Sequence, residues 1–60
     1  MNSNKQMLTV KEVAEYLGVS ADTVYRMISN NEIVFIKIRG SLRIPKTNLE
    51  EWVKMKITKG

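Results

Sequence analysis

The sequence contains no cysteine and no histidine. Disulfide bonds and thiolate metal sites are therefore excluded, and the commonest metal ligand and general base are missing as well. No apolar run approaches the roughly 18 residues that a membrane helix needs, and the first residues lack the basic-then-apolar pattern of a signal peptide. We therefore expect a cytoplasmic protein with no metal, no cofactor and no membrane partner.

The chain is also too short for a deep catalytic cleft. Its 60 residues allow one domain, and a chain of this size buries only about 60% of the surface it exposes when unfolded. Glu50 and Glu51 are adjacent acids, but neighbouring helix residues point about 100° apart and do not face one substrate. With no nucleophile beside a base and no glycine-rich phosphate loop, we predict that the protein is not an enzyme.

Positive charge is concentrated in the second half of the chain. The net charge is +4; residues 1–32 carry three basic and four acidic side chains, whereas residues 33–60 carry seven basic and two acidic. Four of these cations lie between Lys37 and Lys46 with no acid among them. The excess indicates a polyanionic partner. The alternative is that these cations serve only solubility.

Capping signals and apolar spacing predict two short helices in the first half. Thr9 followed by Glu12 has the spacing of a capping box, and Gly18, which readily adopts positive φ, ends the first helix. Ser20 is the N-cap candidate for a second helix that runs from residue 21 to about residue 29. Apolar residues expected to face inward are Val10, Val13, Ala14 and Leu17 in the first helix and Ala21, Val24, Met27 and Ile28 in the second.

The short break between these helices is typical of a helix-turn-helix, in which the second helix is presented to a DNA groove. Ala14 is small where the two helices approach each other, and we expect Val19 to fill the corner between them. The second helix would then expose a polar outer face, made of Asp22, Thr23, Tyr25, Arg26 and Ser29.

Residues 33–44 predict a β-hairpin, because "IVFIKI" and "LRI" are rich in β-branched residues and "RGS" separates them. A three-residue loop would set Ile38 opposite Leu42 and Ile36 opposite Ile44, with Lys37 paired to Arg43 on the solvated face.

Pro45 ends the second strand, and Thr47 to Glu50 repeats the capping-box signature before a third helix. Leu49, Trp52 and Val53 form its apolar stripe. We expect Trp52 to anchor the core and not to stack on bases.

The expected fold is mainly α with a small β-hairpin: a winged helix-turn-helix followed by a C-terminal helix. We expect a disordered leader over residues 1–7, the DNA-binding domain over residues 8–55 and a flexible basic tail over residues 56–60.

Two phrases, "GVSxxTVYR" and "RIPKxxLEEW", carry a resemblance to a known family. From Leu8 to Val53 the chain resembles the excisionase family of MerR-like winged helix-turn-helix domains. The resemblance implies binding to duplex DNA, either as a directionality factor that steers an integrase towards excision or as a small transcriptional regulator. The chain departs from the family pattern at Asn31, where a glycine is usual, and at Ala21, where a basic residue is frequent.

Candidate DNA contacts on the second helix each have a plainer alternative. Arg26 suits a guanine or phosphate contact, or is a solvated cation. Tyr25 donates to a phosphate, or packs against the hairpin. Ser20 is first a helix cap and also suits a phosphate oxygen. Thr23 offers a methyl group for thymine, or is exposed helix surface, and Ala21 allows a close approach of the backbone.

Further candidates lie on the hairpin. Lys37, Arg39 and Arg43 surround a tip made of Gly40 and Ser41, so that a slender tip enters a groove while the cations meet phosphates. The alternative is a solvated strand face.

We predict sequence-specific binding to double-stranded DNA by a protein that is monomeric in isolation and cooperative on DNA. The favoured role is excisionase-like directionality control of a mobile element, with an integrase as a further partner. A small transcriptional regulator with the same contacts is the alternative, and a protein-interaction adaptor is a third.

Overall fold

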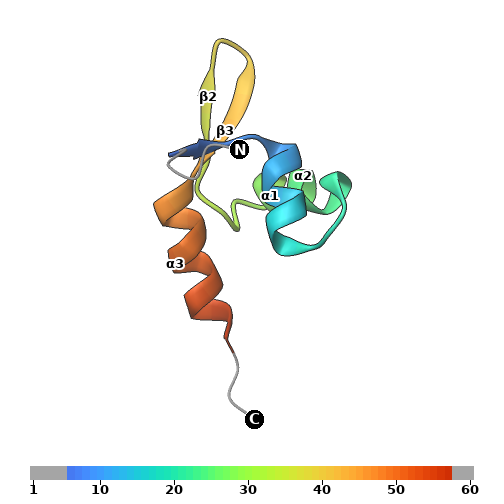
Figure 1. The fold of residues 1–60 in the computed structure, drawn as a ribbon. Coiled ribbons are helices and arrows are strands. Elements are labelled where there is room, and N and C mark those ends of the chain that lie inside the picture. Colours follow the sequence, from blue (N-terminus) through green and yellow to red (C-terminus); the bar gives the residue numbers. More distant parts are fainter. Residues whose placement is uncertain (1–5, 58–60) are drawn as a thin grey trace.

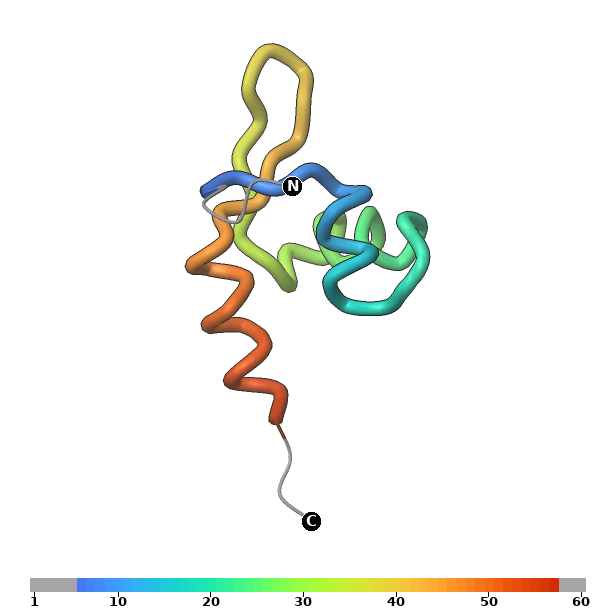
Figure 2. Tube along the Cα trace, in the orientation of Figure 1, coloured from blue at the N-terminus to red at the C-terminus, as the bar shows by residue number. Residues whose placement is uncertain are grey.

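The computed structural model describes residues 6–57, and within this range the chain forms three α-helices and three short strands. In chain order these are β1 (Met7–Leu8), α1 (Val10–Leu17), α2 (Ala21–Ser29), β2 (Ile36–Ile38), β3 (Ser41–Pro45) and α3 (Lys46–Lys56). The hairpin of β2 and β3 and the helix α3 extend from the core in opposite directions (Figures 1 and 2). The predicted fold, mainly α with a small hairpin as the wing, is confirmed.

Two predicted domain boundaries are corrected. Met7 was placed in a disordered leader but forms β1, and Lys56 was placed in a flexible tail but ends α3. Gln6 and Ile57, which also fall in the predicted leader and tail, are described, whereas residues 1–5 and 58–60 lie outside the described residues.

Helix α1 begins and ends at the predicted residues. The Thr9 main-chain N–H donates to the Glu12 carboxylate at 2.9 Å, and the Glu12 N–H donates to the Thr9 hydroxyl at 3.1 Å, which is the complete capping box. At the other end Gly18 has a φ of 72°, and the Val19 N–H donates back to the Ala14 carbonyl at 3.0 Å. This is the Schellman pattern that glycine favours.

Helix α2 ends in the same way without a glycine. Asn31 has a φ of 56°, and the Glu32 N–H donates to the Met27 carbonyl at 2.9 Å. Asparagine tolerates this left-handed conformation better than other residues that carry a Cβ. Asn31 therefore performs the turn for which glycine is usual, and its departure from the family pattern leaves the helix end intact.

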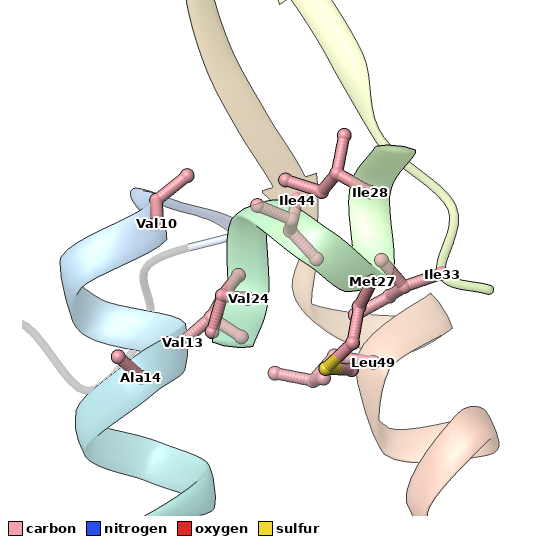
Figure 3. Packing of buried hydrophobic residues seen from close by; sticks show 9 residues of the cluster. All are labelled: Val10, Val13, Ala14, Val24, Met27, Ile28, Ile33, Ile44 and Leu49. Atoms are coloured by element: carbon pink, nitrogen blue, oxygen red, sulfur yellow. The ribbon is translucent and has the colours of Figure 1, made fainter. Parts of the chain in front are cut away.

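The core lies where α1, α2, β3 and the first turn of α3 meet (Figure 3). Its most deeply buried large side chains are Val13, Val24, Ile44 and Leu49. The buried residues of the core are Val10, Val13, Ala14, Val24, Met27, Ile28, Ile33, Ile44 and Leu49.

Three predictions about the core are wrong. Trp52 is only partly buried and Leu49 anchors α3 instead; the ring of Trp52 lies 5.4 Å from the ammonium group of Lys56. Val19 is 39% exposed and does not fill the corner between the helices. Ala21 is exposed at the start of α2 and does not face inward.

A third strand that the sequence pattern did not predict joins the hairpin. β1 pairs antiparallel with β3, Met7 with Pro45 and Leu8 with Ile44, so the sheet order is β1-β3-β2. The same pairing changes the start of α3. The Lys46 N–H donates to the Gln6 carbonyl at 2.8 Å, and α3 begins there without a side-chain cap, so the capping box predicted at Thr47 is wrong.

The hairpin register differs from the predicted one by one residue. Ile36 pairs with Arg43, Lys37 with Leu42 and Ile38 with Ser41. Only Arg39 and Gly40 form the loop, with φ values of 51° and 83°, as a two-residue type I′ turn requires. The predicted loop of Arg39, Gly40 and Ser41 is therefore wrong, because positive φ values at Arg39 and Gly40 close the turn and leave Ser41 in β3.

Candidate nucleic-acid interface

The first turn of α2 is organised by two hydroxyl groups. The Ser20 hydroxyl accepts the Thr23 main-chain N–H at 3.2 Å, which confirms Ser20 as the N-cap. The hydroxyls of Ser20 and Thr23 also lie 3.0 Å apart and share a hydrogen bond. Thr23 is half-buried, whereas Ser20 and Ala21 are exposed. The surface at the start of α2 therefore consists of a small side chain next to a hydroxyl that is already oriented.

Tyr25 and Arg26 form the exposed ridge of α2, and each borders a different hollow. Tyr25 is 50% exposed and lines a cleft shared with the hairpin. Arg26 is exposed and lines a groove of about 430 Å³ on the side towards α3. That groove is mainly apolar and is lined by Leu17, Val19, Thr23, Arg26, Met27, Glu32 and Trp52.

The shifted register places the cations of the hairpin on both of its faces. Residues directly opposite each other in an antiparallel pair share a face, so Lys37 lies on the face of Leu42, and Arg43 lies on the face of Ile36. The predicted pairing of Lys37 with Arg43 on one face is therefore wrong. We name Lys37, Arg39 and Arg43 the wing cations. They give positive charge to both faces of the hairpin and to its tip.

The register also exposes apolar side chains. Ile36 and Ile38 are 38% and 49% exposed, because they lie on the face opposite to the buried Ile44. Arg43 on the same face is half-buried, and its guanidinium donates to the Leu42 carbonyl at 2.7 Å.

A cleft of about 430 Å³ separates the hairpin from the two helices. The start of α1, Tyr25 of α2 and the beginning of β3 line it, through Thr9, Val10, Lys11, Tyr25, Gly40, Ser41, Leu42 and Arg43. None of these described lining residues is acidic, so Lys11 and Arg43 make the cleft positive.

Lys11 is a cation of this cleft that the sequence pattern did not single out. It is exposed at the second position of α1. Its position beside the wing results from the pairing of β1 with β3, which brings the start of α1 to the hairpin. The signal available in the sequence was weak: Lys11 is one cation in an acidic half of the chain.

Over residues 6–57 no group of three or more His, Cys, Asp or Glu side chains is arranged to hold a metal ion. Within the same range no helix is long and apolar enough to cross a membrane. The predictions that the protein has no cofactor and no catalytic activity stay predictions.

The family comparison covers almost the whole described chain: residues 7–56 match the model described as "Helix-turn-helix domain". The chain belongs to this helix-turn-helix family. The match spans α1, α2, the wing and α3, so the family includes the whole arrangement and not the helix pair alone.

Curated relatives share about half of their length with this helix-turn-helix chain. It is 33% identical over 49 residues to a protein named "Probable excisionase" from Saccharopolyspora erythraea. The aligned residues make up 82% of this chain and 50% of that relative. It is 44% identical over 39 residues to a "Putative DNA-binding protein" of Mycobacterium tuberculosis, in strains CDC 1551 / Oshkosh and H37Rv, covering 65% of this chain and 50% of the relative. No solved structure matches significantly.

These matches agree with the excisionase-family helix-turn-helix predicted from the motifs. The narrower MerR-like assignment stays a prediction.

Proposed function

We propose that this helix-turn-helix domain binds duplex DNA, with α2 in the major groove and the wing at the adjacent backbone and minor groove. The observation that carries the proposal is that Tyr25 of α2 and residues 40–43 of the wing line one positive cleft. The helix and the hairpin are therefore neighbours on a single surface, as they must be to contact adjacent grooves of the same duplex.

The contacts of α2 follow from its exposed ridge. Arg26 is the only basic residue between Ser20 and Asn30, and its guanidinium fits the O6 and N7 atoms of guanine. Ser20 and Tyr25 offer hydroxyl groups to phosphate oxygens. Ala21 lets the start of the helix approach the DNA closely, and the Thr23 methyl group suits a thymine methyl.

The wing fits a groove because of where its charges lie. A hairpin inside a groove has a phosphate strand on each side, and the wing cations occupy both faces of the hairpin and its tip. Gly40 in the turn and Ser41 at the start of β3 are small residues that keep this end of the wing slender, which lets it enter. Arg39 lies in the turn between the two strands.

For the biological role we propose an excisionase-like directionality factor, with an integrase as a second partner. The support is the name of the Saccharopolyspora erythraea relative and the size of the module. One small module buries roughly 600–1,000 Å² of its own surface on DNA, so useful affinity requires neighbouring copies or a partner bound next to it. We therefore propose several monomers on closely spaced sites and a bent duplex.

Selection of duplexes from a random pool tests the proposal. We expect one short motif to be enriched, binding that weakens steeply with salt, and displaced mobility in a circular-permutation assay on attachment-site DNA. Tight binding of one stable dimer to a lone palindrome, with no attachment-site binding, contradicts the directionality role and favours a transcriptional regulator. Weak binding without any preferred sequence contradicts DNA recognition and favours an adaptor.

A further inference from the structure

The cleft between the wing and the helices faces DNA only when both elements bind the duplex, so the role inferred for it rests on the proposed function. The major and minor grooves of a duplex are separated by one sugar-phosphate strand. A helix in one groove and a hairpin in the adjacent groove therefore straddle a single strand. The cleft is the space between Tyr25 and the beginning of β3, so it lies where this strand has to pass.

We infer that the cleft seats one segment of the phosphodiester backbone, and that Lys11 is a DNA-binding residue that holds it. Lys11 and Arg43 are contributed by different elements and line the same cleft, which contains no acidic residue among those described. A DNA backbone strand carries one negative charge per nucleotide, so a cleft with two cations complements its charge. The mainly apolar groove beside Arg26 offers less complementary charge.

The charge of Lys11 is available for this contact. Its acidic neighbour Glu12 is held by the Thr9 main-chain N–H at 2.9 Å on the capping side of the helix. The Lys11 side chain is exposed, and its ammonium group has three donors for phosphate oxygens.

The β3 side of the cleft is already ordered in the protein without DNA. One guanidinium nitrogen of Arg43 donates to the Leu42 carbonyl at 2.7 Å, which holds the side chain at the edge of β3 and leaves its other N–H groups as donors. In an antiparallel strand the main-chain N–H and C=O groups of successive residues point alternately towards the paired strand and away from it. Ile38 and Ser41 close the two-residue turn and form the first such pair. The main-chain groups of Leu42 therefore point away from β2, towards this edge.

A charge-removing substitution with a matched control tests the inference. Lys11→Gln keeps the length and helix preference of the side chain but removes the charge, and Lys54→Gln removes an exposed charge on α3, which extends away from the wing (Figure 1). Binding to a random-sequence duplex is measured by fluorescence anisotropy across a salt series. Phosphate contacts do not depend on sequence, so this probe needs no known target.

We expect Lys11→Gln to reduce the slope of log affinity against log salt by about 0.9, which corresponds to about an eightfold loss at 0.1 M salt relative to 1 M. Lys54→Gln should follow the wild type. Circular dichroism and a melting curve check folding, and Lys11→Ala repeats the measurement.

A second measurement locates the phosphate. On a duplex selected from a random pool, single phosphates are replaced one at a time by neutral methylphosphonate. At one position the replacement should weaken the wild type and leave Lys11→Gln unchanged.

The failures of the two proposals differ. If the wild type binds no duplex in a salt-dependent manner, the DNA-binding function is wrong. If the wild type binds but folded Lys11→Gln keeps the full salt slope, or no methylphosphonate position is coupled to Lys11, the cleft does not seat the backbone.

Discussion

Arg26→Ala is the most direct test of sequence reading by α2. The side chain is exposed and borders a groove that Glu32 also lines. Removing it should therefore change the free energy of unfolding by no more than about 0.5 kcal/mol, as for other surface positions. A loss of DNA affinity can then be attributed to the contact and not to unfolding.

The expected loss follows from the geometry of the guanidinium group. One bidentate contact to guanine contributes about 1–3 kcal/mol of discrimination, or about 5- to 150-fold in affinity. No second cation on α2 compensates. The loss should appear on the selected duplex and be much smaller on a scrambled duplex of the same length.

Arg26→Lys is the matched control. It keeps the charge and loses the planar fork, so binding to the scrambled duplex should be retained while preference for the selected sequence falls. Fluorescence anisotropy on both duplexes measures the difference. Equal weakening on both duplexes would refute base reading and make Arg26 a phosphate contact, and no weakening on either would make it a solvated cation.

Three further predictions concern the wing, the core and the turn. Replacing all three wing cations with Gln should reduce the salt slope by about 2.7, at about 0.9 for each phosphate contact, with native circular dichroism; an unchanged slope would place the wing away from DNA. Leu49→Ala should lower the free energy of unfolding, measured in urea, by about 2–5 kcal/mol out of a total of roughly 3–9 kcal/mol. Met55→Ala, at an 81% exposed position, is the control and should have little effect. Comparable losses for the two variants would contradict the role of Leu49 as the anchor of α3. Gly18→Ala should lower the free energy of unfolding in the same assay by about 1–2 kcal/mol, because the φ of 72° at this position disfavours a residue with a Cβ. The added Cβ would meet no atom within 4 Å, so steric contact is not the cause. A neutral result would mean that the turn readily changes its conformation.

The sequence by itself determined the two helices of the helix-turn-helix, because their signals are local. The Thr9 and Glu12 capping box, the Ser20 cap and the stop at Gly18 each act within a few residues of chain, and the apolar spacing fixes which face turns inward. The same local signals failed at α3. A capping box at Thr47 was available, but a hydrogen bond from Lys46 to the distant Gln6 starts the helix earlier.

Most of the candidate site on α2 could also be predicted from the sequence, because a helical face follows from spacing alone. Tyr25 and Arg26 are exposed on the predicted outer face and Ser20 is the predicted N-cap, whereas Thr23 of the same face is half-buried. The wing was predicted as an element but not in register, since a single residue in the left-handed conformation, Arg39, decides between a two-residue and a three-residue loop. That choice moved Lys37 and Arg43 to opposite faces.

Only the tertiary structure decided how these pieces form one surface. Met7 and Leu8 pair with a strand more than thirty residues later in the chain, and two residues are too few to carry a strand pattern. This pairing fixes the start of α1 against β3 and brings Lys11 to the cleft beside Arg43. The sequence thus determined which residues each helix exposes, because helix geometry is local, whereas the charge of the cleft depends on contacts between distant segments that no local pattern encodes.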